Sequence, residues 1–128
     1  MIDQPESAPV NYDALMQANL AQVFSERDTS RRIKAIREFY TEDAVLYEPE
    51  GVSKGHAAIS EAVTALLASL PQEVTFQAVG LAVGHHNVGR LKWRSGPANG
   101  PAAVTGVDVA HFENGRIQSL YVFLDPAS

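Results

Sequence analysis

Apolar residues in the first half of the chain recur every three or four positions, the pattern of helices that lie on a core. Asn11 can cap a first helix, and Asp28-Thr29-Ser30 ends it and caps a second. A third helix is expected to begin near Gly55-His56 and to end at Pro71. The stripes predicted to be buried are Tyr12, Met16, Leu20, Val23 and Phe24; Ile33, Ile36, Phe39 and Tyr40; and Ile59, Val63, Leu66, Leu67 and Leu70. The charges around the second helix, Arg31, Arg32, Lys34, Arg37 and Glu38, are expected to form a solvated face.

The rest of the chain has the composition and the two-residue period of strands. A short strand from Ala44 to Glu48, ended by Pro49 and the turn residues Glu50-Gly51, precedes the third helix. Asn114-Gly115 is a strong hairpin signal, because both residues accept a positive φ. Helices followed by an antiparallel meander predict an α+β fold, with three N-terminal helices packed on a strongly curved, mostly antiparallel sheet. The four later strands are predicted at Val74 to Val83, His85 to Trp93, Ala102 to Glu113 and Arg116 to Leu124.

The chain of 128 residues is long enough for one domain with a core of its own. We expect residues 1–10 to be a mobile tail and residues 11–128 to form the single domain. The sequence contains no cysteine, no His-x-x-x-His pair and no tight cluster of acids, so we expect neither a metal ion nor another cofactor. The formal charge of −5 argues against a nucleic-acid partner, since phosphate binding depends on a basic face.

The apolar runs of the chain are all too short to span a bilayer, so no membrane partner is expected. The first residues, Met1-Ile2-Asp3-Gln4-Pro5-Glu6, lack the basic and apolar regions of a signal peptide. We therefore expect an intracellular, cytoplasmic protein.

One of the predicted strands carries a carboxylate in the middle of its buried side. The two-residue period places Asp108 on the same side of the sheet as Val104, Gly106, Ala110 and Phe112. A carboxylate moved out of water finds partners or takes up a proton, and a neutral acid in an apolar pocket is common catalytic equipment. The alternatives are an edge position that still meets water, or a hydrogen bond to a neighbouring strand.

The order of several short motifs resembles the nuclear transport factor two-like superfamily, in particular SnoaL-like proteins and ketosteroid isomerase. These motifs are Phe39-Tyr40-Thr41-Glu42-Asp43-Ala44-Val45, then Glu48-Pro49, then Gly55 at the start of a helix, and Gly106-Val107-Asp108-Val109-Ala110-His111-Phe112-Glu113-Asn114-Gly115-Arg116-Ile117. The resemblance covers nearly the whole chain from Tyr12 onward. It implies a cone-shaped α+β fold whose sheet and helices enclose one deep apolar pocket.

The resemblance also implies roles for three residues. Glu48 matches the isomerase base that stands just before a proline, and Asp108 matches its protonated aspartate, which helps to hold the enolate oxygen. Asn19 stands where the isomerase has a tyrosine, and an amide is a much weaker acid than a phenol. Limonene epoxide hydrolases share the fold, but they require an arginine and an aspartate two positions apart, where this chain has Lys92 and Arg94. We disfavour that chemistry.

The residues themselves support the same three candidates. Asn19 falls between Met16 and Val23 on the apolar side of the first helix, where an amide needs a partner or a ligand. Glu48 shares a strand face with Leu46 and would lie at the rim of a pocket. The alternatives are an Asn satisfied by water or backbone at an interface edge, and a Glu exposed at a strand end. Two carboxylates in different environments would divide into a base and an acid, which suits proton abstraction next to a carbonyl.

The remaining candidates line the pocket or the opposite face of the sheet. Trp93 is expected in the pocket wall, or alternatively in the ordinary core, with Arg90, Lys92 and Arg94 pointing outward. His85-His86 places imidazoles on both faces of a strand, so one of them would point inward, but a histidine at the start of a strand is more often a surface residue. The residues predicted to contact the ligand are Leu46, Leu91, Trp93, Gly106, Leu120, Val122 and Leu124.

Two functional classes follow from these observations. The first is an isomerase or cyclase that acts by proton transfer on a small apolar carbonyl compound, with Glu48 as base and Asp108 and Asn19 at the enolate oxygen. The second is a non-catalytic ligand-binding or assembly module, since fold does not determine function. In either case we expect a homodimer through the outer sheet face, because Tyr121, Phe123, Val107 and Val109 would otherwise remain in water.

Overall fold

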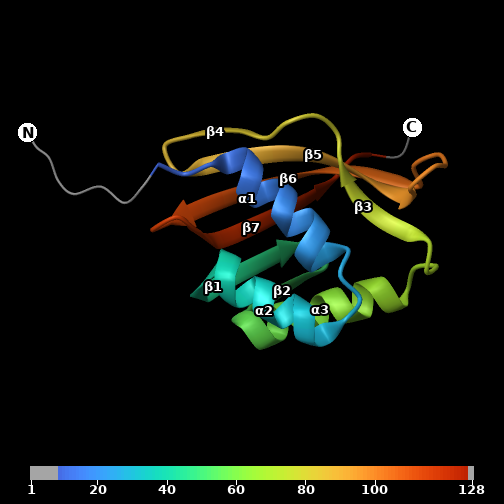
Figure 1. Cartoon of the computed structure of the whole chain (residues 1–128), viewed down its shortest axis with the longest axis horizontal. Coiled ribbons are helices and arrows are strands. Elements are labelled where there is room, and N and C mark those ends of the chain that lie inside the picture. Colours follow the sequence, from blue (N-terminus) through green and yellow to red (C-terminus); the bar gives the residue numbers. More distant parts are fainter. Residues whose placement is uncertain (1–8, 127–128) are drawn as a thin grey trace, which may run out of the picture.

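The computed structural model describes residues 9–126 and shows helices packed on one side of a curved sheet (Figure 1). Most of the predicted tail, residues 1–8, lies outside the described residues. The elements are α1 (Tyr12–Asn19), the π-helical turn η1 (Leu20–Phe24), α2 (Thr29–Phe39), β1 (Tyr40–Glu48), β2 (Gly51–Lys54), α3 (His56–Ala68), β3 (Val74–Ala78), β4 (Val83–His85), β5 (Val88–Pro97), β6 (Val104–Glu113) and β7 (Arg116–Leu124).

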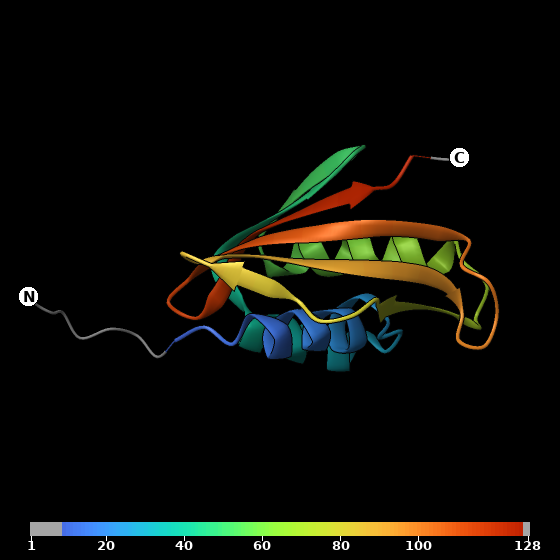
Figure 2. The same ribbon diagram turned by 90° about the horizontal axis from the view of Figure 1, so that it is seen from above.

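The sheet has seven strands in the order β2-β1-β7-β6-β5-β3, and the short β4 pairs with β5. Every pairing is antiparallel except that of β1 with β7, which is parallel. Figure 2 shows the strands arching over the helices, with the opposite face of the sheet left open. The predicted α+β fold of three N-terminal helices on a mostly antiparallel sheet is confirmed.

The structure differs from the sequence prediction at several element boundaries. The segment predicted as one strand from Val74 to Val83 ends at Ala78, and the chain resumes pairing only in β4. The expected turn after Pro49 leads into the additional strand β2. Tyr40, predicted on the second helix, begins β1 directly after α2, while its N–H still donates to the carbonyl of Ile36. Its side chain therefore belongs to the sheet.

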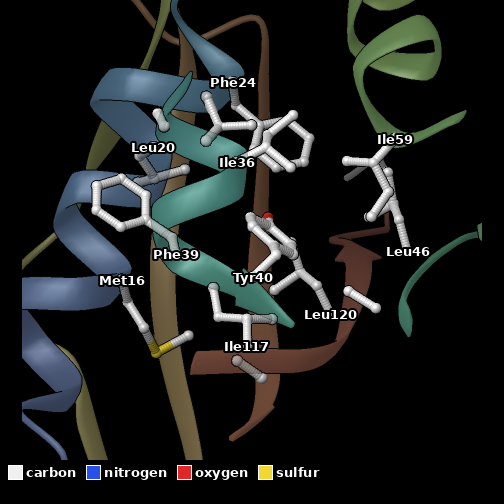
Figure 3. Close-up of a cluster of buried hydrophobic side chains, with 14 of the residues drawn as sticks. Met16, Leu20, Phe24, Ile36, Phe39, Tyr40, Leu46, Ile59, Ile117 and Leu120 are labelled. Atoms are coloured by element: carbon white, nitrogen blue, oxygen red, sulfur yellow. The ribbon is translucent and has the colours of Figure 1, made fainter. Parts of the chain in front are cut away.

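The core lies between the helices and the inner face of the sheet (Figure 3). Met16, Leu20 and Phe24 come from α1 and η1, and they meet Ile36 of α2 and Leu120 of β7 in one cluster. In η1 the N–H of Ser25 donates to the carbonyl of Leu20 at 2.9 Å, a five-residue step that widens the last turn of the first helical segment.

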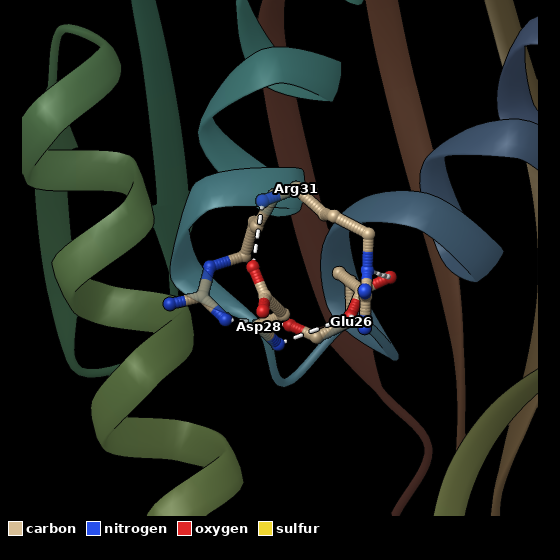
Figure 4. A network of polar contacts seen from close by, with 4 residues as sticks. Glu26, Asp28 and Arg31 are labelled. Carbon is tan, nitrogen blue, oxygen red and sulfur yellow. Dashed lines mark hydrogen bonds and ion pairs between the residues drawn. The ribbon is translucent and has the colours of Figure 1, made fainter.

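Arg32 corrects the expectation that all charges of the second helix are solvated. It is 1% exposed, and its guanidinium donates to the carbonyl of Glu26 at 2.6 Å, to Ser60 Oγ at 3.2 Å and to Thr64 Oγ1. Arg31, one position earlier, remains at the surface and pairs with Glu26 at 3.3 Å (Figure 4). The difference arises because only Arg32 points toward α3.

Strand register places Asp108 in the middle of the inner face. Leu91, Asp108 and Val122 are directly paired across β5, β6 and β7, and Trp93 pairs with Gly106 one step along. Asp108 is 4% exposed, so its predicted position on the buried side of the strand is confirmed.

Candidate functional site

A cavity of about 490 Å³ lies between the inner face of the sheet and the helices. Its lining is mainly apolar, and its polar side chains are those of Glu48, Glu50, Ser95 and Asp108. Its mouth includes the exposed residues Glu50, Val104 and Leu124. The full lining is Leu20, Phe24, Glu48, Pro49, Glu50, Gly51, Ala62, Ala65, Leu66, Leu70, Phe76, Trp93, Ser95, Val104, Asp108, Val122 and Leu124.

Asp108 is the most deeply buried acid of this cavity. Its Oδ1 accepts a hydrogen bond from Trp93 Nε1 at 2.9 Å, and no other group among residues 9–126 donates to its carboxyl. Burial in apolar surroundings raises the pKa of Asp108 to about 7, and the Trp93 hydrogen bond acts in the opposite direction. A substantial fraction of Asp108 is therefore protonated at neutral pH, and the fraction grows as the pH falls.

Glu48 lies at the end of β1, immediately before Pro49, and lines the same cavity. Its side chain is half-buried, and this burial raises its pKa above the ordinary value for Glu. Asp108 is thus the enclosed carboxyl of the cavity, and Glu48 is a carboxyl closer to its mouth. Their unequal burial is the condition under which one can act as a base while the other stays an acid.

Asn19 is hydrogen-bonded to the phenol of Tyr40 and does not line the cavity. It is 2% exposed and is absent from the lining, and its Oδ1 accepts a hydrogen bond from the hydroxyl of Tyr40 at 2.6 Å. Burial, and secondarily the charge of Asp108, raise the pKa of Tyr40 well above its ordinary value, so Tyr40 is a neutral donor. The structure therefore gives Asn19 a protein partner in place of ligand contact.

Sequence reasoning did not identify Tyr40, because it followed the apolar stripe of the second helix. On β1 the buried residues are Tyr40, Thr41, Ala44 and Leu46, whereas Glu42 is exposed, and the pairing of β1 with β7 is irregular between Tyr40 and Val45. Alternation along the strand therefore could not have placed the phenol of Tyr40 beside Asn19.

The predicted ligand contacts divide into two groups. Trp93, Val122 and Leu124 line the cavity. Leu46, Leu91, Gly106 and Leu120 are buried but are not among its lining residues, since they pack within the core or beneath other side chains.

Two aromatic walls of the cavity were not predicted. Phe24 lies edge to face against Phe76, with ring centroids 6.3 Å apart, and Phe76 makes a similar contact with Trp93 at 5.5 Å. Helix α3 adds Ala62, Ala65 and Leu66. The predicted buried stripes included Phe24 and Leu66, but they assigned no inward position to Ala62, Ala65 or Phe76.

The prediction that one of His85 and His86 points inward is wrong, and the alternative of surface residues is confirmed. Both side chains are exposed, and their Nδ1 atoms lie 2.9 Å apart. His86 lies in the turn after β4 with a φ of 52°, so the alternation of a strand does not continue through it. Neither imidazole is among the residues that line the cavity.

The outer face of the sheet carries exposed aromatic residues. Phe123 is 55% exposed and Tyr121 39%, and Tyr47 stacks on Tyr121 with ring centroids 4.5 Å apart. Val107 and Val109 on the neighbouring strand are half-buried. We call this set, Tyr47, Val107, Val109, Tyr121 and Phe123, the outer patch.

Two further observations concern the part of the chain that the structure describes. Within residues 9–126, no three histidine, aspartate or glutamate side chains gather in a way that could hold a metal ion. Within the same range, no helix combines the length and the apolar character needed to cross a membrane.

Comparison with known proteins agrees with this geometry. The family model of the SnoaL-like domain matches residues 20–120. The structure of a candidate isomerase of the SnoaL-like family from Agrobacterium tumefaciens superposes with a TM-score of 0.81 at 27% identity, covering 88% of this chain and 96% of its own. None of the curated proteins matches the sequence significantly.

Two more distant structures share the fold. A candidate polyketide cyclase from Sinorhizobium meliloti has a TM-score of 0.68 at 16% identity, over 85% of this chain and 93% of its own. A candidate ketosteroid isomerase from Kribbella flavida has a TM-score of 0.68 at 12% identity, over 91% of this chain and 79% of its own. At these identities the likeness concerns the fold alone.

Proposed function

The chain belongs to the SnoaL-like family, and on that premise we propose that it is an isomerase or cyclase that transfers a proton next to the carbonyl of a small apolar substrate. The observation that carries the proposal is that Glu48 and Asp108, two carboxyls of unequal burial, line one apolar cavity. This combination is what removal of a proton from carbon requires: a base for the proton and a donor for the oxygen that becomes negative.

Glu48, in its ionised form, takes a proton from the carbon next to the carbonyl. The electron pair of the broken C–H bond moves into the carbon–carbon bond as the carbonyl π electrons move to oxygen. Asp108, in its protonated form, donates a hydrogen bond to that oxygen, which stabilises the enolate in a site from which water is largely excluded. In an isomerisation, Glu48 then returns the proton to the far carbon of a conjugated enolate. In a cyclisation, the enolate carbon attacks a second carbonyl, whose π electrons move to its own oxygen, and Glu48 gives its proton to that oxygen.

The charge of the cavity lining supports a neutral substrate. Its ionisable side chains are Glu48, Glu50 and Asp108, and none of its lining residues is an arginine, lysine or histidine. A carboxylate or phosphate on the ligand would be repelled by the acids and would lack a counter-charge. The aromatic side chains of Phe24, Phe76 and Trp93 favour a flat, apolar compound.

The test is solvent-deuterium exchange into β-tetralone, a neutral bicyclic ketone with acidic α-hydrogens, followed by NMR. We expect the wild type to accelerate exchange, and Glu48→Gln to lose at least about 100-fold of that acceleration, because the amide cannot accept the proton. Glu50→Gln is the matched control: Glu50 is an exposed acid at the mouth of the same cavity, so this variant retains exchange.

Equal exchange in Glu48→Gln and in the wild type would exclude Glu48 as the base. Binding of the ketone without accelerated exchange in the wild type would instead favour the non-catalytic ligand-binding module. In this proposal Asn19 holds the hydroxyl of Tyr40 and does not contact the substrate.

The proposal also includes a cytoplasmic location and a homodimer in which the outer patches of two copies face each other. The support for the dimer is the exposure of Tyr121 and Phe123 on a face that the helices leave uncovered.

A further inference from the structure

The indole of Trp93 crosses from one strand to the next to reach Asp108. Trp93 lies on β5 and is paired with Gly106 of β6, while Asp108 is paired with Leu91. The hydrogen bond from Nε1 to Asp108 Oδ1, at 2.9 Å, therefore runs diagonally across the sheet, and both partners are nearly completely buried.

Gly106 is what makes this crossing possible. A Cβ atom at Gly106 would overlap Cζ2 and Cε2 of the Trp93 indole and the backbone oxygen of Phe123. The backbone of Gly106 is not in the left-handed region, so its conformation does not require glycine. Glycine is required here because a side chain would have no space. The indole thus rests on the bare backbone of β6 beside Asp108.

From this geometry we propose that Trp93 is a positioning residue that decides which oxygen of Asp108 carries the catalytic proton, and that Gly106 provides the room for it. The inference rests on the proposed function for its catalytic meaning. An indole N–H only donates, so Oδ1 is held as an acceptor and the proton of the neutral carboxyl resides on Oδ2. Oδ2 is then the oxygen available to donate to a carbonyl in the cavity.

Burial has the larger effect on the pKa of Asp108, and the same hydrogen bond lowers the pH at which that proton is lost. A donor at Oδ1 stabilises the carboxylate more than the neutral acid, so Trp93 opposes the effect of burial. The other ionisable groups that face this region are Glu48 and Glu50 of the cavity lining and Tyr40, on which the charge of Asp108 acts. The segments η1, α3, β3 and β7 line the cavity with uncharged residues only.

The chain contains a single tryptophan, which makes the inference directly measurable. Indole fluorescence in the ligand-free protein is expected to change with pH along a single titration curve with a midpoint near 7, as Asp108 loses its proton beside the ring. Asp108→Asn should abolish that curve. A curve that persists in Asp108→Asn would mean that another group is responsible, and would contradict the inference.

The decisive experiment removes only the indole N–H of Trp93. Trp93 is replaced by benzothienylalanine, in which sulfur takes the place of the indole N–H in a ring system of nearly the same shape, and the Asp108 carboxyl is titrated by ¹³C NMR. We expect the midpoint to move upward by about one pH unit, because the carboxylate loses its donor. Leu66→Ala is the matched control: it enlarges the same cavity from the side of helix α3, and it should leave the midpoint unchanged or move it downward.

An unchanged midpoint with benzothienylalanine would overturn the inference. Gly106→Ala provides a second route, because displacement of the indole should raise the midpoint in the same direction while all native Trp93 atoms remain. These titrations use the ligand-free protein, so they are independent of catalysis. If they succeed while β-tetralone fails to exchange, the proposed function is wrong and the role of Trp93 in holding Asp108 stands.

Discussion

The burial of Asp108 lowers the free energy of unfolding when its carboxyl is ionised. Its ordinary pKa is 3.8 and rises to about 7 in the folded protein. Between these two values the unfolded chain releases the proton while the folded chain keeps it, so the free energy of unfolding decreases as pH rises from about 4 to about 7. Above pH 7 the full cost of a buried carboxylate, on the order of 4 kcal/mol, is present.

Asp108→Asn should therefore stabilise the protein in a pH-dependent manner. The amide keeps the shape of the side chain, and its oxygen can still accept from Trp93 Nε1, but it has no charge to bury. We expect the variant to gain a few kcal/mol over the wild type at pH 8 and little at pH 4. Urea denaturation at both pH values measures the difference. A gain that is equal at both would show that Asp108 is not ionised in the fold at pH 8 or is not buried.

At the scale of single residues, the alternation of the sequence could predict the positions of Asp108 and Glu48, because every second residue of a strand points to the same side of the sheet. It could not predict the partners. The Tyr40–Asn19 hydrogen bond depends on α2 passing into β1 without a loop, and the Trp93–Asp108 bond depends on a diagonal crossing between strands. Neither contact has a local sequence signal.

Helix α3 forms a wall of the cavity and is held in place by two arginines. Arg27 donates to the carbonyls of Leu67 and Pro71, at 3.0 and 2.9 Å, at the C-terminal end of the helix. Arg32 reaches Ser60 and Thr64 from α2, and it also holds the backbone of Glu26. The position of α3, and with it the width of the cavity, depends on these contacts.

Arg32→Met should cost about 3 kcal/mol of stability, because it removes several charge-assisted hydrogen bonds and leaves buried acceptors without donors. Arg31→Met is the natural control: the neighbouring side chain is 72% exposed, and its ion pair with Glu26 should contribute little to stability because water and salt screen it (Figure 4). Equal losses in the two variants, measured by urea denaturation, would contradict the role assigned to Arg32.

The π-helical turn η1 explains part of what helix periodicity could not predict. The spacing of Met16, Leu20, Val23 and Phe24 correctly indicates which residues are buried, but it is equally compatible with a regular α-helix. The five-residue step instead depends on the surroundings of the last turn, where Ser25 Oγ donates to the carbonyl of Phe76 and accepts from its N–H.

On the scale of the whole molecule, the outer patch is predicted to join two copies. Sedimentation at micromolar concentration should give a dimer for the wild type and a monomer for Phe123→Asp, since a charge at the centre of an apolar interface cannot be solvated. Leu81→Asp is the control, because Leu81 is 75% exposed in the segment between β3 and β4 and lies outside the outer patch. A wild-type monomer would rule out the interface.

The order of elements could be predicted for the whole molecule because helix stripes, strand alternation and the Asn114-Gly115 turn all agree with one architecture. The family was instead predicted from the resemblance of short motifs such as Glu48-Pro49. Cavity size is a different kind of property. It depends on the gap left between α3 and the sheet, to which the residues of α3, β3 and β5 contribute jointly. The pattern of apolar and polar residues predicts which side chains face one another, but it does not predict the width of the gap between α3 and the sheet.

The most direct test of the account is the pH dependence of deuterium exchange into β-tetralone, corrected for uncatalysed exchange. The rate should rise as Glu48 loses its proton and fall again through about pH 7 as Asp108 loses its own, giving a bell-shaped profile. Asp108→Asn should retain the rising limb and lose the falling one, since the amide donor does not ionise. A wild-type rate that stays constant or keeps rising between pH 7 and pH 9 would contradict the assignment of Asp108 as the acid.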